Sequence, residues 1–322
     1  MNFEASKSAV ARSVVRVLAI AAVAVGLNAR GVAAAERPRV LATTTVVADL
    51  VRQVGGDRVA VECLMAPGID PHSYRATPRD ADRLARADLV IASGLHLEGR
   101  LADLLAKLGK RVPVLAVADT LPKERLLEAD AGFQDPHVWF DAALWSLCAA
   151  PVADALAAID ADGAPAYRER ARDYAERLVA LDGRVRERLA TVPAERRVLV
   201  TAHDAFRYFG RAYEVEVVGI QGTSTEAEAG LRDINRLVDL VVTRRIPAVF
   251  VETSVSDRNV AALREGAASR GHAVALGGRL HSDSLGPPDG AAATLEGAIL
   301  ENVETILAGI APPSGGAAPA PP

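Results

Sequence analysis

The chain has 322 residues, of which 50% are hydrophobic, and its 41 acidic residues outnumber 37 basic ones to give a formal net charge of -4. Such mild acidity argues against nucleic acid as a partner, because phosphate binding requires an excess of Lys and Arg. The length exceeds what one hydrophobic core usually spans, so more than one lobe is expected.

The first 35 residues have the layout of a cleaved secretory signal peptide. Basic residues precede an apolar run over 17–27, and small residues end at Ala35. The apolar run is well short of the roughly 20 residues that a membrane-spanning helix needs. Cysteine is missing near the expected cleavage point, which disfavours a lipid anchor. We therefore expect an exported, periplasmic protein whose mature chain begins near Glu36.

Short β-rich runs alternate with helical patterns, which is typical of α/β folds whose mainly parallel sheets are flanked by helices. In a first lobe over 36–164, strands are expected at 40–45, 59–65, 89–92 and 114–117. In a second lobe over 193–311, strands are expected at 197–201, 215–218, 248–252 and 273–276.

One long helix is expected to join the two lobes over 165–192. Its apolar residues recur at spacings of three and four, at Ala171, Tyr174, Leu178, Leu181, Val185 and Leu189. At about 1.5 Å per residue, such a helix is about 40 Å long and can follow both lobes. A helical joint of this kind predicts little movement between the lobes when a ligand binds.

Two other features are expected to carry no chemistry. The tail over 312–322 consists of Pro, Gly, Ala and Ser, a composition typical of disorder. Cys63 and Cys148 lie in apolar contexts. Although the compartment permits a disulfide, we interpret the two cysteines as small buried side chains.

Four residues that can bind a metal follow expected strands. His72, His137 and His203 stand at comparable places, and Asp283 comes after the strand predicted at 273–276. In open α/β sheets, ligands bind in the crevice at the carboxyl ends of the strands. We therefore expect two histidines from the first lobe to meet one histidine and one aspartate from the second.

The tripeptide Asp-Pro-His occurs twice, at 70–72 and at 135–137. Proline fixes its own φ and pushes the preceding residue toward extended geometry, so each histidine should leave a stiff loop. Asp70 and Asp135 are expected to accept nearby N–H groups. Metal ligands must be held within a few tenths of an ångström, which such loops favour.

Three imidazoles and one carboxylate favour zinc, while iron, copper, nickel and manganese stay open. A second oxygen from Asp283 would raise the coordination number and shift the preference toward manganese. The sequence leaves both arrangements open.

Several strings resemble the zinc and manganese solute-binding proteins of ABC importers, over almost the whole mature chain. They are PGIDPHSY (67–74), TPRD (77–80), DPHVW (135–139), TAHDAF (201–206) and SDSL (282–285). The segments GTSTE (222–226) and VFVETS (249–254) resemble the TroA-like branch in particular. The resemblance implies two lobes on one rigid helix, with metal ligands at His72, His137, His203 and Asp283. It also implies a monomer that carries zinc, or alternatively manganese, to an importer permease in the inner membrane.

Two departures bear on the metal. The zinc-specialised branch often has a long His-rich loop before the second ligand, whereas residues 121–134 contain no histidine. The manganese-specialised branch often has glutamate at the third position, where this chain has His203. The first departure weakens the prediction of zinc alone, and the second weakens the prediction of manganese alone.

Alternative roles are open for other residues and for the whole chain. His96, His272 and His281 are left outside the ligand set, although His96 can border the site and His281 can contact it. Glu252 can either orient a ligating imidazole or cap the next helix near Arg258. Because three histidines with an open position also make a catalytic zinc site, a zinc hydrolase is an alternative. A metal-binding surface adhesin is another.

Overall fold

The computed structural model describes residues 37–129 and 132–310, so the predicted signal peptide (1–35) and the predicted tail (312–322) lie outside the described residues. The first sheet is parallel, with strand order β2-β1-β3-β4. Its strands are β1 (Arg39–Ala42), β2 (Ala60–Cys63), β3 (Leu89–Ala92) and β4 (Val114–Ala116). All four fall where the sequence predicts strands.

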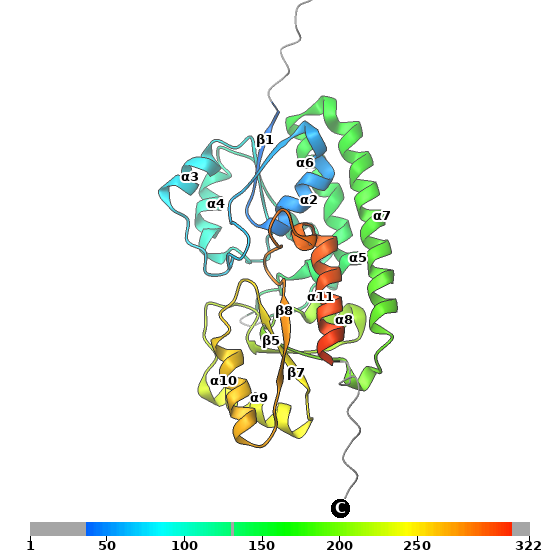
Figure 1. The fold of residues 1–322 in the computed structure, drawn as a ribbon. Helices are drawn as coiled ribbons and strands as arrows, with labels where there is room; N and C mark the ends of the chain where they lie inside the picture. Colours follow the sequence, from blue (N-terminus) through cyan, green and yellow to red (C-terminus); the bar gives the residue numbers. More distant parts are fainter. Residues whose placement is uncertain (1–36, 130–131, 311–322) are drawn as a thin grey trace, which may run out of the picture. The chain divides into compact units, whose positions relative to one another are not determined.

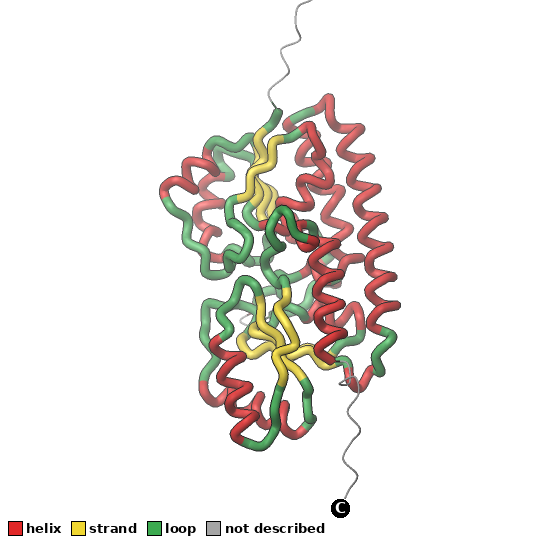
Figure 2. The backbone as a smooth tube through the Cα atoms, viewed as in Figure 1, coloured by secondary structure: helices red, strands yellow, loops and turns green. Residues whose placement is uncertain are grey.

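The second half contributes two parallel strand pairs, β5 (Val198–His203) with β6 (Glu216–Gln221) and β7 (Ala248–Glu252) with β8 (Ala275–Leu280). Strands β5 and β7 lie side by side. Figure 2 shows the strands in two groups with loops between them. The predicted α/β class with parallel sheets is confirmed, while the lobe boundaries stay a prediction.

The shorter helices cover these sheets (Figure 1). Side-chain caps start three of them: Thr44 accepts from the Val47 N–H, Thr77 forms a reciprocal capping box with Asp80, and Asp141 accepts from the Leu144 N–H. Helices α2 (Thr45–Gly55), α6 (Ala149–Ile159) and α11 (Leu295–Ile310) pack against α7 (Ala164–Leu189). The others are α3 (Pro78–Ala85), α4 (Ala102–Leu108), α5 (Ala142–Trp145), α8 (Arg207–Tyr213), α9 (Leu231–Thr243) and α10 (Arg258–Ser269).

Residues 142–159 form the one described segment that is long and apolar enough to cross a membrane by length and composition. Half of this segment is buried inside the protein, where α6 packs on α7. Its apolarity therefore matches that of a core helix.

Helix α7 is the predicted joining helix, and it begins and ends within two or three residues of the expected bounds. Its buried residues are Tyr167, Ala171, Tyr174, Leu178, Leu181, Val185 and Leu189. The predicted stripe is therefore the buried face. It packs against α2, α5 and α6 from the first half and against α8 and α11 from the second (Figure 1).

The expected end of the last strand was wrong. The sequence predicts a strand over 273–276, yet β8 continues through Gly277 and Gly278 to Leu280, with a register shift between Val249 and Phe250. A Cβ on Gly277 would lie 2.5 Å from the Phe250 ring, and Gly278 has φ +138°. The two glycines therefore form a bulge in the strand, and β8 carries the chain to within three residues of Asp283.

Cys63 and Cys148 are both free. The Cys63 Sγ donates to the Met65 carbonyl oxygen at 3.1 Å, and burial raises the pKa of the Cys63 thiol to about 11. Burial likewise raises the pKa of Cys148. Both thiols are therefore protonated and unreactive near neutral pH.

Candidate metal centre

The four predicted ligand residues meet at the carboxyl ends of parallel strands. His72 lies in the loop from β2 to α3, His137 follows β4, and His203 is the last residue of β5, while Asp283 comes just after β8. One possible ligand atom from each residue lies within 4.8 Å of all the others, and all four residues are buried. The structure thus brings together the whole predicted set.

Three distances between possible ligand atoms are equal. His72 Nε2 lies 3.3 Å from His137 Nε2. His137 Nε2 lies 3.3 Å from Asp283 Oδ1, and His203 Nε2 lies 3.3 Å from Asp283 Oδ2. The Nε2 atoms of three imidazoles and the oxygens of one carboxylate therefore face a common centre.

Both Asp-Pro-His loops form the same turn. Asp70 Oδ1 accepts the His72 N–H at 2.9 Å, and Asp135 Oδ1 accepts the His137 N–H at 3.0 Å. These bonds across two residues are Asx turns. The predicted role of the two aspartates as acceptors for loop N–H groups is confirmed.

Carboxylates also fix two of the rings. Asp135 Oδ1 lies 2.7 Å from His137 Nδ1, and Glu252 Oε2 lies 2.6 Å from His203 Nδ1. Glu252 Oε1 accepts the His203 N–H at 2.8 Å as well. A carboxylate beside Nδ1 holds the proton there and leaves Nε2 for a metal. Of the two roles open for Glu252, the structure favours orienting an imidazole.

Two contacts around Asp283 were not predicted from the sequence. Ser254 Oγ donates to Asp283 Oδ2 at 3.3 Å. The buried Trp139 donates its Nε1–H to the Ser282 carbonyl oxygen at 3.1 Å. This bond ties the loop of Asp283 to the loop of His137. Only the folded arrangement pairs these positions, so no local sequence signal marks them.

The histidines of the site differ in proton affinity. Burial lowers the pKa of His72 to about 4. Burial also favours the neutral form of His137, but Asp135 and then Asp283 outweigh it and hold that pKa at about 9. For His203, burial is outweighed by Glu252 and Asp283, and its pKa lies well above the ordinary value. Asp283 is buried too, yet the two rings hold its pKa well below the usual range.

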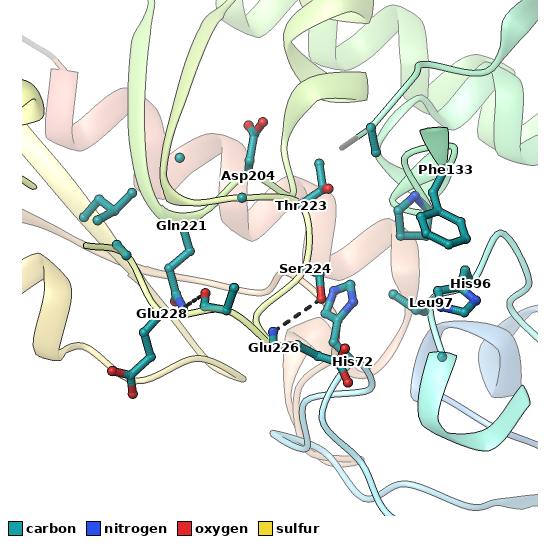
Figure 3. A pocket seen from close by; sticks show the side chains of 18 of the residues that line it. His72, His96, Leu97, Phe133, Asp204, Gln221, Thr223, Ser224, Glu226 and Glu228 are labelled. Atoms are coloured by element: carbon teal, nitrogen blue, oxygen red, sulfur yellow. Dashed lines mark hydrogen bonds between the residues drawn. The ribbon is translucent and has the colours of Figure 1, made fainter. Parts of the chain in front are cut away.

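A cavity of about 600 Å³ opens beside the site (Figure 3). Its lining includes His72, His96, Phe133, Asp204, Thr223 and Ser224. The His96 ring stacks on Phe133 with centroids 4.6 Å apart, so His96 borders the cavity without joining the four ligand atoms. Burial raises the pKa of Asp204 to about 6.

The remaining histidines face elsewhere. His281 Nε2 lies 3.5 Å from Glu301 Oε1, on helix α11. His272 Nε2 lies 2.9 Å from the Ile246 carbonyl oxygen. Neither belongs to the group of four ligand atoms.

Comparison with known proteins decides the family. The family described as ZnuA, the periplasmic component A of a zinc-uptake complex, matches residues 40–309. The chain belongs to this family. The manganese-binding lipoprotein MntA of Bacillus subtilis is 43% identical over 282 residues, which are 87% of this chain and 92% of that protein. The zinc-binding protein TroA of Treponema pallidum is 40% identical over 284 residues, 88% of this chain and 92% of that protein.

The fold agrees with this membership. The solved structure of the periplasmic zinc-binding protein TroA from Treponema pallidum superposes with a TM-score of 0.84 and 40% identity. The match covers 86% of this chain and all of that one. The predicted resemblance to metal-binding, solute-binding proteins of ABC importers is therefore confirmed, and with it the fold class.

In this member of the ZnuA family, replacing Glu252 with glutamine is expected to weaken zinc binding by about 10- to 100-fold. The amide keeps one acceptor for the His203 main chain but removes the charge beside Nδ1, so the ring is held less firmly. Competition with a zinc chelator measures the change. Glu301→Gln is the matched control, because Glu301 lies beside His281 and not in the site. Equal losses in both variants would contradict a positioning role for Glu252.

Proposed function

We propose that the protein captures a divalent transition metal as cargo, zinc first and manganese next, through His72, His137, His203 and Asp283. The convergence of these four buried side chains carries the proposal. Two ligands come from each predicted lobe, so a bound ion joins the lobes. The loaded protein then docks on the permease of an ABC importer, which withdraws the ion.

The distances between ligand atoms support zinc. A regular tetrahedron with edges of 3.3 Å, the separation of three ligand pairs here, places its centre about 2.0 Å from each corner. Zinc–nitrogen and zinc–oxygen bonds have that length, and zinc prefers four ligands in this arrangement. Two of these contacts use different oxygens of Asp283, and the four ligand atoms lie within 4.8 Å of one another, so the side chains must draw together to form a regular tetrahedron around the ion.

The chemistry of the ligands points the same way. Imidazole suits zinc, whereas manganese prefers shells rich in oxygen. The two Asp283 oxygens face different rings, so a second oxygen can reach the ion and admit manganese as the alternative cargo. Relatives named as zinc-binding and as manganese-binding proteins are both similar to this chain.

We further propose that the protein acts as a monomer in the periplasm, after a signal peptide over 1–35 is removed and without a lipid anchor. The charge and apolar pattern of that segment supports export. The mature protein should begin near Glu36, which sequencing of its N-terminus tests.

Metal analysis of protein purified from its own periplasm tests the function directly. We expect about one zinc per chain, with zinc displacing manganese when the two compete. A genomic neighbourhood with an ATPase and a multi-span permease would add support. Purified protein that holds no transition metal, and takes up none in a titration, would refute the proposal.

A further inference from the structure

The segment 222–230 between β6 and α9 reaches across to loops of the first half. Thr225 Oγ1 donates to Asp70 Oδ2 at 2.7 Å. The next residue, Glu226, forms an ion pair with Arg100 at 2.6 Å. Both partners in the ion pair are substantially exposed, so that pair contributes little by itself. The Thr225 bond differs, because its acceptor is part of the loop that carries His72.

Asp70 has its two oxygens divided between two tasks. Oδ1 accepts the His72 N–H, while Oδ2 accepts both the Ser73 hydroxyl and the Thr225 hydroxyl. Thr225 is therefore linked to His72, a proposed metal ligand, through Asp70, although Thr225 and Asp70 lie 155 positions apart in the sequence.

The second Asp-Pro-His loop shows what Asp70 lacks. Asp135 makes the same turn, but its carboxylate also contacts the ring of its own histidine at Nδ1. Asp70 contacts only the main chain of His72. Within 37–129 and 132–310, the only hydrogen-bond partner of the His72 ring is Nε2 of His137. The position of His72 thus depends on its loop, and the loop depends on Asp70.

His72, although buried, is the proposed ligand that faces the cavity. It is the one proposed ligand among the described residues that line the 600 Å³ cavity (Figure 3). His137 and His203 are fully buried and Asp283 is 1% exposed, compared with 4% for His72. An ion that leaves the centre for the cavity therefore passes His72.

We propose that Thr225 is a positioning residue for the metal, and that its hydrogen bond to Asp70 holds the His72 loop in place across the two halves of the protein. The Gly68 N–H also donates to Ser284 Oγ across the two halves, at 2.8 Å, so the loop has a second tie farther from His72. Breaking the Thr225 bond therefore loosens the part of the loop that carries His72 and weakens the hold on its imidazole. The inference rests on the proposed function, since it takes His72 as a ligand.

The test compares three variants of the full mature protein after zinc loading. Thr225→Val keeps the side-chain shape but removes the donor, and Thr225→Ser restores a hydroxyl. Thr191→Val is the matched control, because it makes the same change at an exposed threonine just after helix α7, where the hydroxyl donates to the Arg188 carbonyl oxygen. Zinc release into a fluorescent chelator is followed by stopped flow. We expect release about tenfold faster for Thr225→Val, with near-normal rates for the other two, because a hydrogen bond to a carboxylate is lost.

A second measurement separates positioning from general loosening of the fold. The visible spectrum of the cobalt-loaded protein depends on ligand geometry, so Thr225→Val should change it while Thr225→Ser and Thr191→Val retain it. Wild-type release and spectrum in Thr225→Val, or failure of Thr225→Ser to restore them, would overturn the proposal. If the unmodified protein binds neither zinc nor cobalt, the proposed function itself fails, which is a distinct result.

Discussion

Replacing Asp283 with alanine is expected to weaken zinc binding by more than about 100-fold, since the loss of a supporting partner alone costs 10- to 100-fold. Among the residues that the structure describes, Asp283 supplies the only negative charge of the four-residue group, with one oxygen toward His137 and the other toward His203. Without it, three imidazoles remain to hold a doubly charged ion at a buried position. Titration against a chelator of known affinity measures the loss.

The control for this variant is Asp289→Ala, which removes an exposed aspartate from the same loop region. It should leave zinc affinity unchanged. Asp283→Ala also tests the alternative of a zinc hydrolase. Intact zinc retention together with loss of hydrolysis of an ester substrate would favour an enzyme over a transport protein.

Acidification is expected to release the metal. If two protons compete with the ion, the metal affinity should fall by up to about 100-fold for each pH unit below neutrality. Asp135 and Asp283 hold the pKa of His137 at about 9 despite burial, and the pKa of His203 is raised as well. Both rings therefore carry an extra proton near pH 7 in the unloaded protein. The ion must displace these protons from Nε2, since Nδ1 keeps its proton beside a carboxylate.

Calorimetric titrations in buffers of different ionisation enthalpy measure this proton release. We expect about one to two protons per zinc near pH 7, because two histidines have raised pKa values. Undiminished affinity near pH 5 would count against the assignment of these ligands.

The protons that weaken metal binding at low pH also stabilise the unloaded protein. The pKa of His137 rises from an ordinary value of 6.5 to about 9 on folding. Its protonation therefore contributes stability that is fully present below 6.5 and is lost as the pH rises through about 9. Zinc stabilises the loaded form more strongly at higher pH. The gap in melting temperature between loaded and unloaded protein should thus narrow as the pH falls.

Much of the site could be predicted because its information is local. A β-rich run predicts each strand. Because the carboxyl ends of parallel strands meet at one edge, residues that follow these ends, such as His203 and Asp283, are predicted to lie close together. The Asp-Pro-His turns are equally local. The buried face of α7 follows from the spacing of its apolar residues.

Features that depend on pairing between distant segments could not be predicted. The Gly277-Gly278 pair has the composition of a turn, and only the Phe250 ring against it explains a bulged strand. The role of Glu252 was undecided because its neighbour His203 is set by the contact between β5 and β7. Thr225 lies in the GTSTE string (222–226) that resembles the TroA-like branch, but nothing in the sequence pairs it with Asp70, since that bond exists only when both halves have folded.

The four proposed ligands, from His72 to Asp283, come from three loops and the end of strand β5, and no two of them are near neighbours in the chain. A nascent or partly folded chain offers scattered imidazoles, which bind an ion weakly and without selectivity. Tight metal binding therefore requires the folded protein, and the binding free energy of the ion in turn stabilises the folded state. Metal scarcity should then shorten the lifetime of the protein against proteases, so the supply of cargo would regulate the amount of its carrier.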